Sequence, residues 1–301
     1  MSLPSGLRRD VPLARFTTIG TGGPARWLGQ PTTLAELTEL LGWAGGEGLA
    51  VEAIGLGSNV LVSDGGVDAL VLRLGGELAA VTILGTTLTA GGGATNAVCL
   101  HRARDAGLGG LEFASAIPGT AGGGVRMNAG AYGRDWRDIL LDVTVVDAVG
   151  PRTVGAAELH LGYRRSELRP GEVVAFARYR LEARPPAEVR ARVAELQAQR
   201  KATQPTNRRT FGSVFKNPEH ELGAGRMLDE CDLKGHAVGG ARISPVHANF
   251  IENTGAATSA DAVALMVEAR RRAYERFGVV LEHEVRFLGP LELPAVPAAG
   301  L

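Results

Sequence analysis

The segment that most constrains this chain is residues 110–133, GLEFASAIPGTAGGGVRMNAGAYG, which holds seven glycines, one proline and two charged residues. Glycine tolerates positive φ and lets the backbone approach a ligand or another segment closely. Residues 117–120 predict a tight turn, because proline fixes φ and glycine permits the reversal. Main-chain N–H groups in such a turn can form a concave site for anions such as phosphate. The residues alone fit a packed loop equally well.

Length and composition exclude several classes of protein. A chain of 301 residues exceeds a typical single domain, so we expect two or three domains. The 32 basic and 32 acidic residues cancel, which argues against a nucleic-acid or anionic-lipid surface. Cys99 and Cys231 lie far apart without a CxxC partner, so we expect no disulfide, no metal site and a reducing cytoplasm. No apolar run reaches ~18 residues, and no apolar stretch follows the N-terminal arginines, so neither a membrane span nor a signal peptide is expected.

Hydrophobic periodicity predicts an α+β body rather than a regular βαβ repeat. Residues 1–30 and 110–133 are expected to be irregular. The GxGxxA match at 20–25 is not read as a dinucleotide fingerprint, because the residues after Pro24 look extended instead of opening a helix. Helices are expected over residues 32–45, 96–106, 187–202, 224–231 and 259–277. Strands are expected over residues 51–54, 67–74, 78–84, 86–90, 139–147, 173–181, 247–251 and 279–288.

A second glycine turn follows the strand at 51–54, in the sequence GLGSNVLV of residues 55–62. A strand, a glycine turn with Ser and Asn side chains, and a second strand suit the binding of phosphates. The turn is not a Walker loop, because no GK[ST] follows it. A simple β-turn remains the alternative for these residues.

Polar residues gather in four further places, none of which has the spacing of a known catalytic motif such as HExxH, GxSxG or the P-loop lysine. Spacing alone therefore does not name a reaction. The four clusters are Tyr163 with Arg164, Ser213 with Lys216 and Asn217, His247 with Asn249, and Glu282 with His283 and Glu284.

Taken together and in order, six segments between about residue 15 and residue 289 resemble the UDP-N-acetylenolpyruvoylglucosamine reductase family. They are GLGSNVLVSDGG (55–66), IPGTAGGGVRMNAGAYG (117–133), GYRRS (162–166), GSVFKNP (212–218), HANFIEN (247–253) and LEHEVRFLG (281–289). The resemblance implies an α+β protein with an FAD-binding fold of the vanillyl-alcohol-oxidase (PCMH) type in two subdomains, residues 1–73 and 74–203. A substrate domain over 204–289 and a flexible tail over 290–301 follow.

The resemblance also implies a cytoplasmic enzyme of peptidoglycan precursor synthesis. NADPH reduces a non-covalently bound FAD and leaves, and the enolpyruvyl sugar nucleotide then binds. Hydride goes to the methylene carbon of this substrate and a proton to the adjacent carbon, which gives UDP-N-acetylmuramate. No nucleic acid, membrane insertion or obligate protein partner is expected.

Three residues match the catalytic positions of the family: Arg164, Ser213 and Glu284. Hydride addition pushes negative charge into the carboxylate of the substrate, and a guanidinium is a suitable donor to it. Arg164 matches the arginine of the family at that place. Ser213 matches its proton-donating serine, and the nearby Lys216 could ease loss of the serine proton. Glu284 matches its third catalytic residue.

The remaining binding residues are expected on the two glycine turns and on the substrate segments. Expected FAD contacts are Gly55, Leu56, Gly57, Ser58, Asn59, Ile117, Pro118, Gly119, Thr120, Gly122, Gly123, Asn128, Ala129 and Gly130. Expected substrate contacts are Tyr163, Lys201, Lys216, Asn217, Asn253 and Arg286.

The chain departs from the family pattern at a few positions. Leu56 replaces a usual glycine, and Phe211 stands where a small residue is common. Only 49 positions separate Arg164 from Ser213, which is too short for an inserted lid subfold and indicates the shorter subgroup.

Two other functions stay open. One is an oxygen-using flavin oxidase, although no histidine lies within 50–65 or 110–133 for covalent flavin attachment. The other is a non-catalytic nucleotide-binding module, which retention of Arg164, Ser213 and Glu284 together speaks against.

Overall fold

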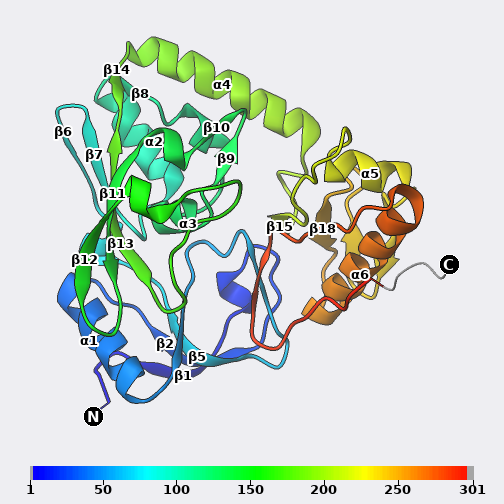
Figure 1. Cartoon of the computed structure of the whole chain (residues 1–301), viewed down its shortest axis with the longest axis horizontal. Helices are drawn as coiled ribbons and strands as arrows, with labels where there is room; N and C mark the ends of the chain where they lie inside the picture. The colour runs from blue at the N-terminus through cyan, green and yellow to red at the C-terminus, as the bar shows by residue number, and fades with distance from the viewer. Residues whose placement is uncertain (1–2, 297–301) are drawn as a thin grey trace. The chain divides into compact units, whose positions relative to one another are not determined.

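In this computed structural model, which describes residues 3–296, the chain forms two compact units that are interleaved in sequence (Figure 1). The first unit holds the residues up to Val11, Arg26–Leu56 and Asp68–Arg200. The second holds Pro12–Ala25, Gly57–Val67 and the chain from Lys201 onward. The four-part division expected from the sequence stays a prediction, and residues 297–301 of its tail lie outside the described residues. No described helix is long and apolar enough to cross a membrane.

The first unit is built on a four-stranded sheet of order β1-β2-β5-β3 and a five-stranded sheet of order β12-β11-β13-β7-β6. Strands β3 and β5 run parallel, whereas neighbours within the second sheet run antiparallel. The strands of the first sheet are β1 (Arg8–Pro12), β2 (Pro24–Gly29), β3 (Ala50–Ala53) and β5 (Val67–Leu72). Those of the second are β6 (Val81–Leu84), β7 (Thr87–Gly91), β11 (Leu140–Val146), β12 (Pro151–Gly155) and β13 (Val173–Arg180).

The expectation of an irregular stretch over residues 1–30 is wrong, because β1 and β2 form there. Both strands are short, and the turns around Gly20 interrupt their apolar alternation. The extended backbone expected after Pro24 is confirmed as β2. Further two-residue strands are β8 (Leu108–Gly109), β9 (Gly130–Ala131), β10 (Arg134–Asp135) and β14 (Glu182–Ala183). The 3-10 helices are η1 (Ala14–Phe16), η2 (Gly76–Ala79), η3 (Glu112–Ala116), η4 (Trp136–Asp138) and η5 (Ala156–Leu159).

Helices α1, α2 and α3 and all but the last turn of α4 belong to the first unit. Helices α2 and α3 pack against its five-stranded sheet (Figure 1). The four helices are α1 (Leu34–Gly46), α2 (Asn96–Asp105), α3 (Ala121–Arg126) and α4 (Pro186–Thr203). Helix α1 is capped by Thr33, whose side chain accepts the N–H of Glu36. The Glu36 carboxylate completes the turn by accepting the N–H of Thr32.

Helix α3 lies inside the segment expected to be irregular, so that expectation is wrong there. Glycine is a poor helix former, and a run of three glycines argues against a helix. The helix forms because its first N–H groups are taken by another turn: Ala121 donates to the carbonyl of Ala94, and Gly122 to that of Gly92. Gly124 allows the helix to pack on a tryptophan, since a Cβ there would lie 2.7 Å from the indole of Trp136.

The second unit is built on a sheet of order β15-β18-β17-β16 and on a parallel pair, β4 with β19. Helices α5 and α6 pack on each other, and α6 also packs on β16 and β17. The strands are β4 (Val60–Val62), β15 (Thr210–Ser213), β16 (Ala237–Val238), β17 (Ala241–Ile243), β18 (Phe250–Asn253) and β19 (Arg286–Leu288). The helices are α5 (Ala224–Glu230) and α6 (Ser259–Phe277).

Two expectations for this unit need correction. The strand expected over 279–288 is reduced to β19, because residues 282–284 bond to 214–216 instead of extending a sheet. The strand expected over 247–251 begins only at Phe250, because 247–249 form a turn. Helix α6 spans the expected residues and is followed by Gly278 at a φ of +68°. Its cap is Thr258, which forms a reciprocal capping box with Asp261.

We expect His247, in this turn, to make the stability of the second unit depend on pH. Burial, followed by the positive charge of Lys234, lowers the pKa of His247 below its ordinary value of 6.5. The native imidazole therefore stays neutral where the unfolded chain is protonated, so the unfolded state binds more protons as the pH falls. We expect the melting temperature to fall as the pH decreases through 6.5.

The measurement is the melting temperature of the wild type and of His247→Asn between about pH 8 and pH 5. The difference between the two proteins should narrow on acidification, since only the wild type loses stability through this imidazole. A difference that stays constant over the range would contradict the assignment.

Candidate active site

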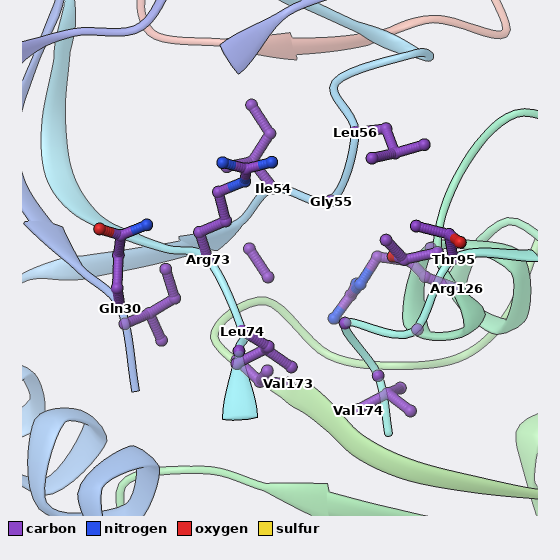
Figure 2. A pocket seen from close by; sticks show the side chains of 18 of the residues that line it. Gln30, Ile54, Gly55, Leu56, Arg73, Leu74, Thr95, Arg126, Val173 and Val174 are labelled. Atoms are coloured by element: carbon purple, nitrogen blue, oxygen red, sulfur yellow. The ribbon is translucent and has the colours of Figure 1, made fainter. Parts of the chain in front are cut away.

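A cavity of about 550 Å³ opens within the first unit (Figure 2). Its walls come from the ends of the parallel strands β3 and β5, the turn between β7 and α2, helix α3 and the beginning of β13. Much of this lining is backbone, because glycines stand at residues 55, 75, 92, 93, 122 and 123. A cavity of this size can hold a sizeable part of a cofactor.

The glycines of the cavity serve two different purposes. At Gly92, a Cβ would lie 1.9 Å from the carbonyl oxygen of Val174, so only glycine lets these two backbones pack. At Gly55, a Cβ would lie 2.5 Å from the hydroxyl of Thr120. Gly123 differs, because the nearest atom to a Cβ there is 3.6 Å away. Because Gly123 lines the cavity and little else lies near it, we expect a side chain at residue 123 to extend into the cavity.

Positive charge and an unused acceptor accompany the cavity. Arg126 reaches from α3 toward the start of β13, where it donates to the carbonyl of Glu172 (Figure 2). Arg73 is a second guanidinium in the lining. Next to the lining residue Thr95, Asn96 donates its side-chain amide to the carbonyl of Ile117 at 3.0 Å. Its buried Oδ1 has no partner among the described residues.

This arrangement fits a flavin dinucleotide. Guanidinium groups and main-chain N–H groups suit its pyrophosphate. The glycines leave room for the ligand against the backbone. Sequence reasoning missed Arg73, Arg126 and the Gly92–Gly93 pair. The run AGGG of residues 90–93 at the end of a predicted strand was a signal for that pair.

The segments around the cavity match a known kind of domain. The family described as "FAD binding domain" matches residues 26–154, which contain most of the cavity lining. The protein is therefore a FAD-binding oxidoreductase with a further C-terminal domain. Residues 204–288 match "UDP-N-acetylenolpyruvoylglucosamine reductase, C-terminal domain".

Relatives extend this match over almost the whole chain. The UDP-N-acetylenolpyruvoylglucosamine reductase of Novosphingobium aromaticivorans is 42% identical over 96% of this chain and 98% of its own. The enzyme of this name from Anaeromyxobacter dehalogenans is 44% identical over 97% of this chain and 88% of its own. The crystal structure of the enzyme from Thermus caldophilus is 38% identical, with a TM-score of 0.83 over 94% of this chain and 100% of that one. This chain belongs to the UDP-N-acetylenolpyruvoylglucosamine reductase family, which confirms the expected family and fold class.

The predicted FAD contacts fall into three groups in the structure. Gly55, Leu56, Thr120, Gly122 and Gly123 line the cavity. Residues 117–119 immediately precede Thr120, and 128–130 follow α3. The buried Asn128 accepts the N–H of Arg137 and donates to the carbonyl of Gly162. Residues 57–59 belong to the second unit.

Arg164 lies on a tight turn of the first unit, where Gly162 and Arg165 exchange main-chain hydrogen bonds of 3.0 and 3.2 Å. Its φ is +55°, an uncommon conformation for a residue with a side chain. Its guanidinium donates to the carbonyl of Gly130 at 2.8 Å and lies over the ring of Tyr163. Such strain is concentrated at functional sites, which favours a functional role for this arginine.

The second unit brings Ser213 and Glu284 onto adjacent segments. Glu284 donates its N–H to the carbonyl of Val214 at 2.8 Å. Lys216 donates its N–H to the carbonyl of Glu282 at 2.9 Å, and its ammonium pairs with that carboxylate at 2.6 Å. The amide of Asn59 donates to the carbonyl of Glu284 at 3.2 Å. The end of the 55–59 turn is therefore fixed to the segment of Glu284.

The other predicted substrate residues differ in their surroundings. Lys201 is exposed in the last turn of α4, and Arg286 begins β19. Asn217 accepts the N–H of Ala224 at the start of α5. Asn253 donates to the carbonyl of Ile19 and accepts two main-chain N–H groups, so its amide has a structural use.

Enlarging Gly123 should weaken FAD binding. Overfilling a packed site costs about 1–3 kcal/mol, so Gly123→Leu should bind FAD roughly 10- to 100-fold more weakly, because its side chain would enter the cavity. Titration of apoprotein with FAD measures this, with Gly123→Ala as the smaller control. Wild-type affinity in the leucine variant would contradict the placement of the cofactor.

Proposed function

We propose that this chain uses NADPH to reduce UDP-N-acetyl-3-O-(1-carboxyvinyl)glucosamine to UDP-N-acetylmuramate, in the synthesis of peptidoglycan precursors. One observation carries the proposal: proteins named UDP-N-acetylenolpyruvoylglucosamine reductase match this chain across both units. The protein from Novosphingobium aromaticivorans is 42% identical over 96% of the chain. The glycine-lined cavity supports non-covalent FAD as the cofactor. When bound, FAD supplies hydride transfer from NADPH to the enolpyruvyl double bond.

Arg164 stabilises the negative charge that develops on the substrate during hydride addition. Addition at the methylene carbon moves the electron pair of the double bond toward the substrate carboxylate. A guanidinium presents two parallel N–H groups to such a carboxylate, and it stays charged at any working pH. The bond from Arg164 to the carbonyl of Gly130 holds this group in one direction before substrate binds, so little reorganisation is needed in the transition state.

Ser213 is the proton donor. Its hydroxyl proton goes to the carbon that bears the carboxylate, which completes the saturated product, and solvent then restores the hydroxyl. The ammonium of Lys216, three residues away, pairs with Glu282 in the structure, and its proposed part is to ease loss of the serine proton by its positive charge. Glu284 lies on the segment bonded to Val214 and acts beside Ser213, on the carboxylate of the substrate. Lys201, Asn217, Tyr163 and Arg286 are the residues proposed to contact the sugar nucleotide.

The cellular setting is also part of the proposal. Both cysteines are buried thiols without a disulfide, as suits a reducing compartment. The enzyme is proposed to work in the cytoplasm on a sugar nucleotide and NADPH, without an obligate protein partner.

The direct test is turnover by purified protein. NADPH and the enolpyruvyl sugar nucleotide should give a product heavier by two hydrogen atoms, detected by mass spectrometry. Denaturation should release all flavin from the chain. Oxygen consumption that matches NADPH oxidation without substrate would favour an oxidase, and bound FAD that NADPH cannot reduce would favour a binding module.

A further inference from the structure

The buried Asn249 holds both main-chain polar groups of one residue in the second unit. Its Oδ1 accepts the N–H of Phe215 at 2.9 Å, and its Nδ2 donates to the carbonyl of Phe215 at 2.8 Å. The side chain is only 4% exposed. The side-chain amide of Asn249 therefore makes the two main-chain hydrogen bonds to Phe215 that a neighbouring strand would otherwise make.

Asn249 takes the place of a strand partner at the point where regular strand pairing ends. Strands β15 and β18 pair Ser213 with Phe250, after a register irregularity that follows Thr210. The carbonyl of Asn249 accepts the N–H of Val214 at 2.9 Å, and its side chain then takes over at Phe215. The ladder thus continues past Ser213 through a side chain, although the partner strand has turned away.

The opposite edge of the same segment is bonded to residues 282–284. Val214 accepts the N–H of Glu284, and Lys216 donates its N–H to Glu282. Residues 214–216 are therefore held on both sides, by Asn249 and by the segment of Glu284. Ser213 precedes this clamped stretch directly, and Lys216 ends it.

The turn that carries Asn249 is itself fixed by His247. The Nδ1 of His247 accepts the N–H of Asn249 at 3.1 Å, and its ring packs edge-on to Phe250 at 5.0 Å. Gly225 on α5 makes room for the ring, since a Cβ there would lie 2.4 Å from its Cε1. This explains the His247–Asn249 cluster, to which the reaction itself assigns no part.

We infer that Asn249 is a positioning residue for proton transfer: it sets the backbone after Ser213, and with it the place of the serine hydroxyl relative to Glu284. The inference rests on the proposed function. A misplacement of about 1 Å can cost on the order of 10²-fold in rate, because proton transfer needs the donor within hydrogen-bond reach of the acceptor. Reduction of the flavin by NADPH does not use this proton.

The test separates the two halves of the reaction under anaerobic conditions, by stopped-flow absorbance of the flavin. Asn249→Ala removes both bonds to Phe215. Asn249→Asp is the milder variant, which keeps the acceptor but places a second oxygen against the carbonyl of Phe215. The matched control is Asp64→Ala, which removes two main-chain bonds at the start of α6, to Ser259 and Ala260, without touching residues 213–216.

For the Asn249 variants we expect flavin reduction within about twofold of wild type, and reoxidation by the enolpyruvyl substrate slower by roughly 10- to 100-fold. The solvent deuterium isotope effect on reoxidation should rise, since proton transfer becomes the slow step. FAD content should stay at the wild-type level. Asp64→Ala should keep the wild-type rates of flavin reduction and reoxidation, even if its melting temperature falls as far as that of the Asn249 variants.

Two results would overturn the inference. One is that the rates of flavin reduction and reoxidation fall equally in the Asn249 variants, in step with their melting temperatures. The other is that a folded Asn249 variant reoxidises its flavin at the wild-type rate. If Asn249→Ala does not fold, the same criteria apply to Asn249→Asp. Wild-type protein serves as the reference for the reaction itself. Wild type that fails to reoxidise with the substrate would contradict the proposed function, whereas normal wild type with a normal Asn249→Asp variant would contradict only the role of Asn249.

Discussion

Replacement of Ser213 by alanine should leave flavin reduction by NADPH intact and lower kcat by about 10²- to 10⁴-fold, the usual contribution of a positioned acid or base. The change deletes one oxygen from a half-buried residue at the end of β15. The clamp on residues 214–216 uses main-chain groups, which the substitution keeps. Folding and FAD content should therefore be unaffected, and the loss should fall on proton delivery.

Steady-state assays combined with anaerobic single-turnover absorbance measure this separation. Ser213→Cys is a useful companion, because a thiol can still donate a proton. Loss of both flavin reduction and turnover in Ser213→Ala would show that the serine has another role. Full turnover in the alanine variant would show that it is not the proton donor.

Replacement of Arg164 by methionine should lower kcat by about 10²- to 10³-fold, with a smaller effect on the affinity for NADPH. The guanidinium is held toward the carbonyl of Gly130 in the resting structure, so it meets the developing charge without rearrangement. Arg164→Lys should recover only part of the rate, since an ammonium lacks the planar pair of donors.

The matched control is Arg165→Met, which removes the same charge from the exposed next residue of the same turn. Measurement of kcat and KM for all three variants separates orientation from general electrostatics. Equal losses in Arg164→Met and Arg165→Met would indicate that net charge, rather than the direction of Arg164, explains the effect.

The long elements were predictable from sequence because their signals are local. Helix α6 shows its apolar face and its stop at Gly278 within one stretch of chain. Helix α3 could not be found in this way, because its glycines satisfy tertiary packing on Trp136 and bonds to the turn after β7. The 282–284 segment likewise pairs with 214–216, a contact about 70 positions away in sequence.

The parts of the candidate site that lie on glycine turns were predictable from the sequence, and the other parts were not. Gly55 packs closely on the Thr120 side chain and Gly123 borders the cavity, and a glycine-rich turn signals such places from sequence alone. Arg126 gave no such signal, since its use depends on where β13 begins. Asn249 was visible as a polar residue, but its function depends on a distant segment that only the fold brings beside it.

The most direct test of the account is an anaerobic two-step titration of the purified yellow protein. NADPH alone should bleach the flavin absorbance in the ratio of one NADPH for each FAD. The colour should return only when the enolpyruvyl sugar nucleotide is added, with formation of an equal amount of UDP-N-acetylmuramate. Colour that fails to bleach, or that returns without product, would contradict the proposed reaction.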